Sequence, residues 1–268
     1  MSIDLSPMGL RKTPFTRELA VAERFALPHQ AEATEALAEA VRQRMSAALI
    51  APAGTGKTVA LRVLVAGLPD ARYQVRYVKV TGLSKRDLCK EIAAACGLSP
   101  TGIYPALVRK LQDAFAHASG TDGLRPVIVL DEAHDLRPDS LAMLRLLTNF
   151  EMDSRLVVSL ILAGQPPLKT MLGRPDQAAM AQRLAHYASL RLLSRDETHA
   201  YVVHRCALAG AQTDPFDSDA HEALFEMSLG NLRAIDRIAL KALELAARAG
   251  ASAVSSGEAI QARKLLWP

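Results

Sequence analysis

A loop that contains two glycines, placed between two apolar segments, constrains this chain more than any other feature. Residues 49–58 read Leu-Ile-Ala-Pro-Ala-Gly-Thr-Gly-Lys-Thr, so an apolar run ends in two glycines, a lysine and a hydroxyl. Gly54 and Gly56 allow the backbone to curl until successive N–H groups converge on an anion, and a helix that follows adds the positive end of its dipole. The segment is a predicted phosphate-binding loop of the P-loop type.

The side chains after the glycines have distinct predicted roles. Lys57 is expected to reach the β- and γ-phosphates of a nucleotide, and the Thr58 hydroxyl is expected to hold Mg²⁺. Ala51 stands where the pattern usually has its first glycine, but this position, where the strand ends, need not approach the phosphates closely. The alternative is a strand-to-helix turn with a surface lysine. The residues predicted to contact the nucleotide are Ala53, Gly54, Thr55, Gly56, Lys57, Thr58 and Val59.

A second apolar run, at residues 127–130, ends in the adjacent carboxylates Asp131 and Glu132. Such a run is typical of a buried parallel strand that delivers acids to its carboxyl end. Asp131 is predicted to hold Mg²⁺ through water, and Glu132 to polarise the water that attacks the γ-phosphate. The alternative is a strand before a helix whose N-terminus favours acids. A nucleotide switch without hydrolysis would not need Glu132.

Two other nucleotide-binding classes are disfavoured. Residues 131–134 spell the Asp-Glu-Ala-His box of a helicase family, but such helicases need two RecA-like domains, and 268 residues accommodate only one plus a lid. The Asn-Lys-x-Asp motif that reads a guanine base does not occur in the sequence. We therefore expect ATP, with Mg²⁺, as the nucleotide.

Composition and cysteine usage predict a cytoplasmic protein. The chain is 50% hydrophobic and 22% charged, which is typical of a soluble protein with a sizeable core. Its three cysteines, Cys89, Cys96 and Cys206, lack metal-ligand spacing, and buried thiols in a reducing compartment are expected. No signal peptide and no apolar run near the roughly 18 residues needed to span a bilayer are recognisable, so no membrane association is expected.

The charge balance is mildly basic, with 32 Lys+Arg against 28 Asp+Glu and a formal net charge of +4. A charge of this size permits nucleic-acid binding without demanding it. Basic residues concentrate around one predicted strand and the helix after it; an ordinary solvated face is the alternative. They are Arg72, Arg76, Lys79, Lys85, Arg86 and Lys90.

Apolar periodicity predicts strands that alternate with helices, hence an α/β fold with a mostly parallel sheet wound on both sides. Strands are predicted at 47–50, 73–80, 126–131, 156–162 and 190–193, and helices at 28–45, 59–65, 84–96, 103–118 and 141–150. From 195 onward the pattern is helical, at 195–209, 218–229, 232–248 and 255–265. We predict a nucleotide-binding domain over 1–194, with an N-terminal arm at about 1–27, and a helical lid over 195–268.

Three polar residues stand at the edges of these elements. Gln165, after the strand beside the acid-bearing one, is placed to hydrogen-bond the γ-phosphate or the attacking water, with a helix cap as the alternative. Arg183 can act as an arginine finger toward a neighbouring subunit, with an ordinary surface arginine as the competing account. Arg233 starts a lid helix, where the dipole disfavours a purely structural arginine, and can fold down on the phosphates.

The whole chain resembles an AAA+ ATPase, and within that class it is similar to the ExeA-like and TniB/TnsC-like group, whose relatives include the transposition regulator MuB. The resemblance implies the P-loop AAA+ fold. The Asn-Phe-Glu and Gly-Gln-Pro segments are more specific than the phosphate loop. The matching segments are residues 9–15, 51–58, 130–134, 144–151, 162–166, 182–183 and 230–233.

The resemblance also implies roles. Gln165 corresponds to sensor 1, Arg183 to the trans arginine finger and Arg233 to sensor 2, while the arm around Pro14 and Phe15 packs near the adenine. Such a finger acts only between subunits, so rings or helical filaments are implied. The chain departs from the group at two places. Ala51 replaces the first loop glycine, and Asn-Leu at 231–232 precedes the arginine where secretion relatives commonly carry a proline.

Secretion-type ExeA proteins carry a transmembrane segment and a periplasmic cell-wall-binding part after the ATPase domain. The chain ends at 268 with neither, so we expect the transposition branch, in which the ATP-bound protein polymerises on duplex DNA, recruits and stimulates a DDE-type transposase, and is dismantled by hydrolysis. Lys85, Arg86 and Thr101 are predicted to contact DNA phosphates, because related proteins contact DNA from about this part of the sheet. A secretion-associated ATPase and a nucleotide-gated scaffold with negligible hydrolysis remain alternatives.

Overall fold

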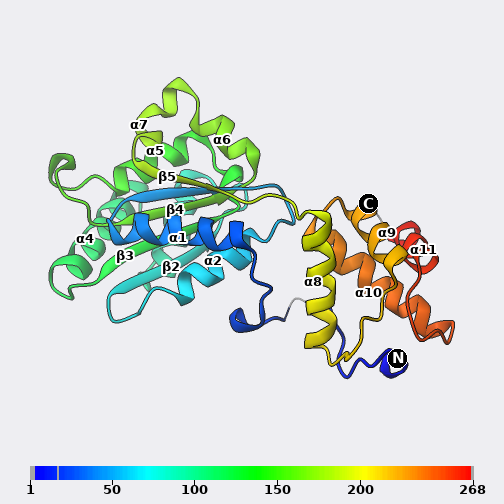
Figure 1. Ribbon diagram of the computed structural model, residues 1–268. Coiled ribbons are helices and arrows are strands. Elements are labelled where there is room, and N and C mark those ends of the chain that lie inside the picture. Colours follow the sequence, from blue (N-terminus) through cyan, green and yellow to red (C-terminus); the bar gives the residue numbers. More distant parts are fainter. Residues whose placement is uncertain (1–3, 17, 267–268) are drawn as a thin grey trace. The chain divides into compact units, whose positions relative to one another are not determined.

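The computed structural model describes residues 4–16 and 18–266 and divides into two compact units (Figure 1). One unit spans residues 28–190, and the other combines residues 1–27 with residues 191–268. The predicted outer bounds of the two domains, residues 1 and 268, lie outside the described residues. The predicted lid begins at residue 195, close to residue 191, where the chain re-enters the second unit. The predicted arm at 1–27 belongs to this second, helical unit and not to the unit of residues 28–190.

The α/β unit is built on a sheet of five strands in the order β2-β3-β4-β1-β5, and every pairing between neighbouring strands is parallel. The predicted parallel α/β sheet is thus confirmed. The strands are β1 (Ser46–Ile50), β2 (Tyr73–Lys79), β3 (Arg125–Asp131), β4 (Ser159–Gly164) and β5 (Leu184–Ser189). The helices are α1 (Pro28–Arg42), α2 (Lys57–Ala66), α3 (Lys85–Ala95), α4 (Tyr104–Gly120), α5 (Pro138–Leu147), α6 (Pro166–Leu172) and α7 (Ala178–Ala181).

Helices cover both faces of this sheet, and the central strands are apolar on both sides (Figure 1). In β3, Val127 and Val129 pack into the core that includes α1 and α2, whereas Ile128 and Leu130 pack into the core of α3, α4 and α5. Because successive side chains alternate between faces, Asp131 shares the face of Val127 and Val129. The alternation therefore directs the Asp131 carboxylate toward α2.

The edge strand β5 and the helices beside it differ from the prediction. The last strand was expected at 190–193 but is Leu184–Ser189, and α5 spans Pro138–Leu147 rather than 141–150. Only Leu184 and Ala188 of β5 are buried, while Tyr187 is 54% exposed, because this strand has a neighbour on one side only. The strand consequently lacks the apolar run by which a central strand is recognised.

The helical unit consists of α8 (Arg195–Leu208), α9 (Ser218–Ser228), α10 (Leu232–Arg248) and α11 (Ser256–Leu265). Capping boxes start two of these helices, formed by Ser194 with Glu197 and by Ser255 with Glu258. The arm carries the short 3₁₀ helices Ser6–Met8 and Val21–Glu23. Its side chains Leu5, Met8, Leu10, Phe15 and Leu27 are buried in the core of these helices.

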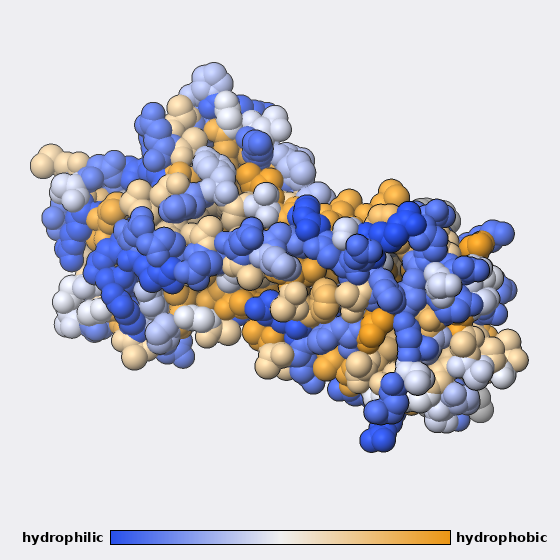
Figure 2. All heavy atoms as spheres, in the orientation of Figure 1, coloured by the Kyte–Doolittle hydropathy of each residue, from blue (hydrophilic) through white to orange (hydrophobic). Residues whose placement is uncertain are grey.

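Hydrophilic side chains cover much of the face drawn in Figure 2, with hydrophobic ones scattered among them. Within residues 4–16 and 18–266, no helix combines the length and the apolar character needed to cross a bilayer.

Candidate functional site: a phosphate-binding loop beside two carboxylates

The predicted phosphate loop joins β1 to α2. Gly54 and Gly56 have φ angles of 76° and 91°, a left-handed conformation that side chains with a Cβ rarely adopt, so the curl of the loop depends on both glycines. The Lys57 side chain is buried and its Nζ donates hydrogen bonds to the carbonyls of Ala51, at 3.0 Å, and Pro52, at 2.9 Å. The ammonium group is thus held along the loop.

Two further contacts fix the loop's shape. The N–H of Ala51 donates to the Gly164 carbonyl at 3.0 Å, so Ala51 continues the pairing of β1 with β4. An alanine fits this position because it belongs to the strand rather than to the curl. On the other side, the buried Gln30 of α1 donates from Nε2 to the Thr55 carbonyl at 3.3 Å.

Thr58 and Asp131 meet at the carboxyl edge of the sheet. The Thr58 hydroxyl donates to Asp131 Oδ2 at 3.1 Å, and the Tyr77 hydroxyl of β2 donates to the same oxygen at 3.0 Å. The N–H of Glu132 donates to Asp131 Oδ1 at 2.8 Å. Partial burial, reinforced by the Asp131 charge, raises the pKa of Tyr77 to about 12, so its hydroxyl remains a donor at neutral pH.

Glu132, His134 and Gln165 form a second polar group at this edge. Glu132 leaves the strand with a φ of 57°, and its Oε2 is buried 3.6 Å from His134 Nδ1, with no hydrogen-bond partner among residues 4–16 and 18–266. Gln165, which starts α6, places its Nε2 2.8 Å from His134 Nε2. The prediction that Gln165 follows the strand beside the acid-bearing one is borne out by the strand order, but its amide contacts His134.

These residues fit a magnesium nucleotide. A hydroxyl and a carboxylate oxygen 3.1 Å apart are hard oxygen ligands of the kind that Mg²⁺ binds together with substrate phosphates. Glu132, the residue after Asp131 in the chain, has a buried Oε2 that accepts no hydrogen bond within the described residues and is suited to one from water. When bound, Mg²⁺ would neutralise charge on the phosphates and polarise them toward attack.

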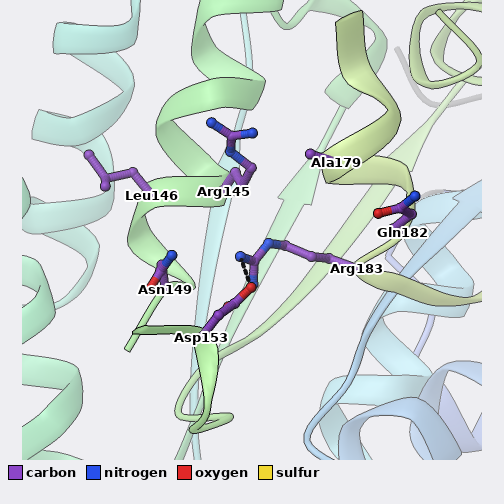
Figure 3. A pocket seen from close by; sticks show the side chains of 7 residues that line it. All are labelled: Arg145, Leu146, Asn149, Asp153, Ala179, Gln182 and Arg183. Carbon is purple, nitrogen blue, oxygen red and sulfur yellow. Dashed lines mark hydrogen bonds and ion pairs between the residues drawn. The ribbon is translucent and has the colours of Figure 1, made fainter. Parts of the chain in front are cut away.

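Arg183 lies between α7 and β5 and lines a pocket of about 450 Å³ (Figure 3). One of its guanidinium nitrogens, Nη2, donates to Asp153 Oδ2 at 2.7 Å, in the ion pair that Figure 3 marks with a dashed line. Its side chain is 17% exposed, so the guanidinium is only partly accessible. The pocket is lined by Arg145, Leu146, Asn149, Asp153, Ala179, Gln182 and Arg183.

Two predicted groups lie in the helical unit. Arg233 is exposed on the first turn of α10, which Asn231 caps by accepting a hydrogen bond from the Ala234 N–H at 3.2 Å. Pro14 and Phe15 are buried, and the Phe15 ring packs against Phe216 at 6.4 Å between centroids. The roles predicted for these residues toward the nucleotide stay predictions.

The residues predicted to bind DNA gather at the start of α3 and in the turn before α4. Lys85 is the first residue of α3, and Arg86 Nη2 donates to the Gly102 carbonyl, next to Thr101, at 3.5 Å. An acid is also near, because Lys85 Nζ lies 3.9 Å from Asp139. The structure thus brings the three residues together, while their contact with DNA stays a prediction.

The sequence prediction missed three residues of the site: Gln30, Tyr77 and His134. His134 was visible as the last residue of the Asp-Glu-Ala-His string, but that pattern suggested a helicase rather than a partner for Gln165. Gln30 reaches the loop because α1 packs against α2, and Tyr77 reaches Asp131 because β2 pairs with β3; neither contact can be seen in the local sequence.

Comparison with known proteins agrees with this geometry. Residues 40–172 match the AAA domain family. The chain is 33% identical over 210 residues to General secretion pathway protein A of Aeromonas hydrophila, a match that covers 76% of this chain and 38% of that protein. The chain therefore spans well under half the length of this curated relative.

Solved structures with a similar fold include Cdc6p from Pyrobaculum aerophilum, with a TM-score of 0.75, 19% identity and coverage of 99% of this chain and 73% of that one. Aeropyrum pernix ORC1, in complex with DNA, gives a TM-score of 0.67 at 21% identity, covering 93% of this chain and 68% of that one. The Thermotoga maritima RuvB branch migration motor gives 0.61 at 16% identity, with 89% and 68% covered. The protein has the α/β P-loop fold of these AAA+ structures, and its residues 40–172 are similar to the AAA domain family.

Proposed function

We propose that the protein is a Mg²⁺-dependent ATPase that hydrolyses ATP to ADP and phosphate. The observation that carries this proposal is the junction of the phosphate loop with the acid-bearing strand, where Thr58 donates to Asp131 and the next residue, Glu132, has one buried carboxylate oxygen, Oε2. A loop that only bound phosphate would not need a second carboxylate with an unpaired oxygen. Glu132 therefore favours hydrolysis over a nucleotide-gated scaffold.

In this proposal each residue has one task. Lys57 exchanges the loop carbonyls for the β- and γ-phosphates, while Thr58 and Asp131 hold Mg²⁺. Glu132 accepts a proton from the attacking water, a contribution of about 10²- to 10⁴-fold to the rate. The remaining nucleotide contacts come from the loop residues 53–56 and from Val59.

Three further residues complete the proposed site. Gln165 orients the attacking water, and Arg183 of one subunit stabilises the charge that develops on the nucleotide of its neighbour. Arg233 contacts the phosphates from the helical unit, and the arm at Pro14 and Phe15 lies on the adenine side. Self-association into a ring or helical filament follows, because a finger that acts between subunits requires a heterologous interface.

We further infer that the ATP-bound protein assembles on duplex DNA and recruits or stimulates a DDE-type transposase, with hydrolysis driving disassembly. The clustering of Lys85 and Arg86 beside Thr101 supports this inference, as does the group resemblance. The fold is also used by a solved protein in complex with DNA. A second candidate, favoured by the match to General secretion pathway protein A, is an ExeA-like ATPase associated with secretion.

Phosphate release and nucleotide binding, measured on the same preparations, test the ATPase. We expect Lys57→Ala to lose both, and Glu132→Gln to bind ATP normally while its hydrolysis falls by about 10²-fold or more. Glu226→Gln is the matched control, because it makes the same change at an exposed position on α9 and should leave both unchanged. Equal hydrolysis in the wild type and Glu132→Gln would remove the catalytic assignment and favour the scaffold.

The two functional branches differ in what stimulates hydrolysis. The transposition branch predicts that duplex DNA changes the rate of phosphate release, and that rings or filaments form on DNA with a non-hydrolysable ATP analogue in electron microscopy. The secretion branch predicts no effect of DNA and association with a membrane partner. Particles that stay monomeric on DNA under these conditions would contradict the transposition branch.

A further inference from the structure

Two histidines and an aspartate converge in the helical unit, and none of the three is assigned to the nucleotide. His199 lies on α8, Asp214 on the segment between α8 and α9, and His221 on α9. One potential ligand atom from each lies within 4.8 Å of the others. Nothing in the proposed ATPase accounts for this group.

The carboxylate between the histidines is held in place by the backbone. The N–H of Phe216 donates to Asp214 Oδ1 at 3.0 Å, which leaves Oδ2 to face both imidazoles. His221 Nε2 lies 2.7 Å from this oxygen and His199 Nε2 lies 3.6 Å from it. Both Nε2 atoms thus approach one carboxylate oxygen, and the imidazole rings meet edge to face with 4.1 Å between centroids.

The start of α9 fixes the backbone that carries one of the three ligands. Asp217 caps α9 by accepting a hydrogen bond from the Ala220 N–H at 2.7 Å, which fixes the first turn that carries His221. The His221 side chain is only 10% exposed, whereas that of His199 is 56% exposed. The group is thus buried on the α9 side and open to solvent on the α8 side, where an ion can enter and keep a water ligand.

We propose that His199, Asp214 and His221 bind a divalent transition-metal ion of the zinc class, which links α8 to α9. A tetrahedral ion about 2.0–2.1 Å from each ligand separates any two ligands by about 3.3 Å. The observed separations of 2.7 and 3.6 Å from Asp214 Oδ2 lie on either side of that value. Small rotations of the side chains bring all three ligands to an ion.

The ligand types select the ion. Two neutral imidazoles and one carboxylate suit Zn²⁺ and its neighbours in the first transition row, whereas Mg²⁺ and Ca²⁺ prefer oxygen throughout. The bond from the Phe216 N–H occupies Asp214 Oδ1, so Oδ2 is the oxygen that would complete this ligand set.

A single-site assay tests the proposal on the full chain, prepared without a polyhistidine tag and without nucleotide. An Asp131→Asn background removes competition from the proposed Mg²⁺ site. We expect one equivalent of Zn²⁺ to bind, with a rise in unfolding temperature, and Co²⁺ to give the intense visible absorption of a four-coordinate site. His199→Ala should weaken Zn²⁺ affinity by about tenfold or more.

Two more variants keep the test decisive. Asp214→Asn retains an oxygen to accept the Phe216 N–H, so the segment keeps its shape while the charged ligand is lost. His117→Ala breaks a His117–Asp122 pair at 3.7 Å, for which the described residues supply no third ligand, and should bind Zn²⁺ like the wild type. Weaker binding in His199→Ala and Asp214→Asn alone supports the site. Zn²⁺ binding that is absent, or equal in all variants, overturns it.

Discussion

The Thr58 hydroxyl donates a hydrogen bond to Asp131 across 3.1 Å, and this contact joins the helix after the phosphate loop to the acid-bearing strand. It links residues 73 positions apart in the chain, so it depends on β3 lying in the right register beside its neighbours. The contact places the two oxygens proposed for Mg²⁺ side by side before any ion binds.

We expect Thr58→Ala to raise the Mg²⁺ concentration that gives half-maximal phosphate release by about tenfold or more. The reason is that the substitution removes one of the two oxygens while the Asp131 carboxylate keeps its bond from Tyr77. A MgCl₂ titration at saturating ATP measures the change. Thr121→Ala, at an exposed helix end, is the control. An unchanged Mg²⁺ requirement would remove Thr58 from the proposed metal site.

Mixed subunits test whether Arg183 acts between subunits. Arg183→Ala should lose about 10³-fold or more of the hydrolysis rate while it retains ATP binding. Glu132→Gln should also be inactive, but a mixture should recover activity, because a Glu132 site in one variant then meets Arg183 from the other. Phosphate release from equimolar mixtures measures this recovery. If the mixture stays inactive while both variants still assemble, Arg183 does not act in trans.

The ion pair between Arg183 and Asp153 should hold the proposed finger within its own subunit. Asp153→Ala breaks this 2.7 Å contact, so we expect half-maximal ATPase activity at a lower protein concentration than in the wild type. Glu151→Ala is a matched control, because Glu151 and Asp153 lie on one short 3₁₀ helix (Glu151–Asp153) and the substitution removes an equal charge by breaking the Glu151–Arg155 pair at 3.0 Å. Identical concentration dependence in both variants would show that Asp153 does not restrain Arg183.

Much of this site follows from local sequence pattern. Gly54 and Gly56 indicate a loop with left-handed backbone conformations. The apolar run before Asp131 predicts the strand that carries this residue, and the alternation of side chains predicts on which face of the sheet its carboxylate lies. Ala51 is explained by the same logic, since it ends a strand. These inferences succeed because each depends on residues that are adjacent in the chain.

The contacts that sequence did not predict join distant segments. His134 can contact Gln165 because the 3₁₀ helix η3 (Ala133–Asp135) lies close to β4 at Gly164. A side chain at Gly164 would prevent this approach, since its Cβ would lie 3.0 Å from the backbone nitrogen of His134. The arm packs into the helical unit through Phe15, whose ring lies 5.6 Å below the Arg205 guanidinium. No periodicity in the arm distinguishes this packing from a position beside the α/β unit.

The surface around Lys85 and Arg86 is expected to contact DNA phosphates without reading sequence. The double substitution to alanine should weaken DNA affinity and reduce the slope of log affinity against log salt by about 1 for each lost contact. Fluorescence anisotropy over a salt series measures both. Replacing Arg263 and Lys264 on α11 with alanine removes the same charge elsewhere. Equal affinity and slope in the two double variants would place the DNA contacts outside this surface.

The hydrogen bond from Tyr77 to Asp131 predicts a pH dependence of folding stability. The Tyr77 pKa rises from 10.0 to about 12 in the folded protein, mainly through burial and secondly through the Asp131 charge. Below pH 10 both states keep the proton, so this contribution is complete; above it the unfolded chain ionises first, and stability falls as pH approaches 12. Because Tyr77 is 47% exposed, the effect should be modest.

Tyr77→Phe separates the contribution of Tyr77 to the pH dependence of stability from the contributions of the other tyrosines. We compare the urea unfolding midpoints of wild type and variant from about pH 8 to pH 11. At the lower pH values the midpoints should differ by a constant offset, which reports the lost hydrogen bond. The two curves should converge at the higher values, because only the wild type then loses the contribution of the Tyr77 proton. Curves that stay parallel throughout would mean that Tyr77 ionises equally in the folded and unfolded chains, and that its bond to Asp131 does not persist in solution.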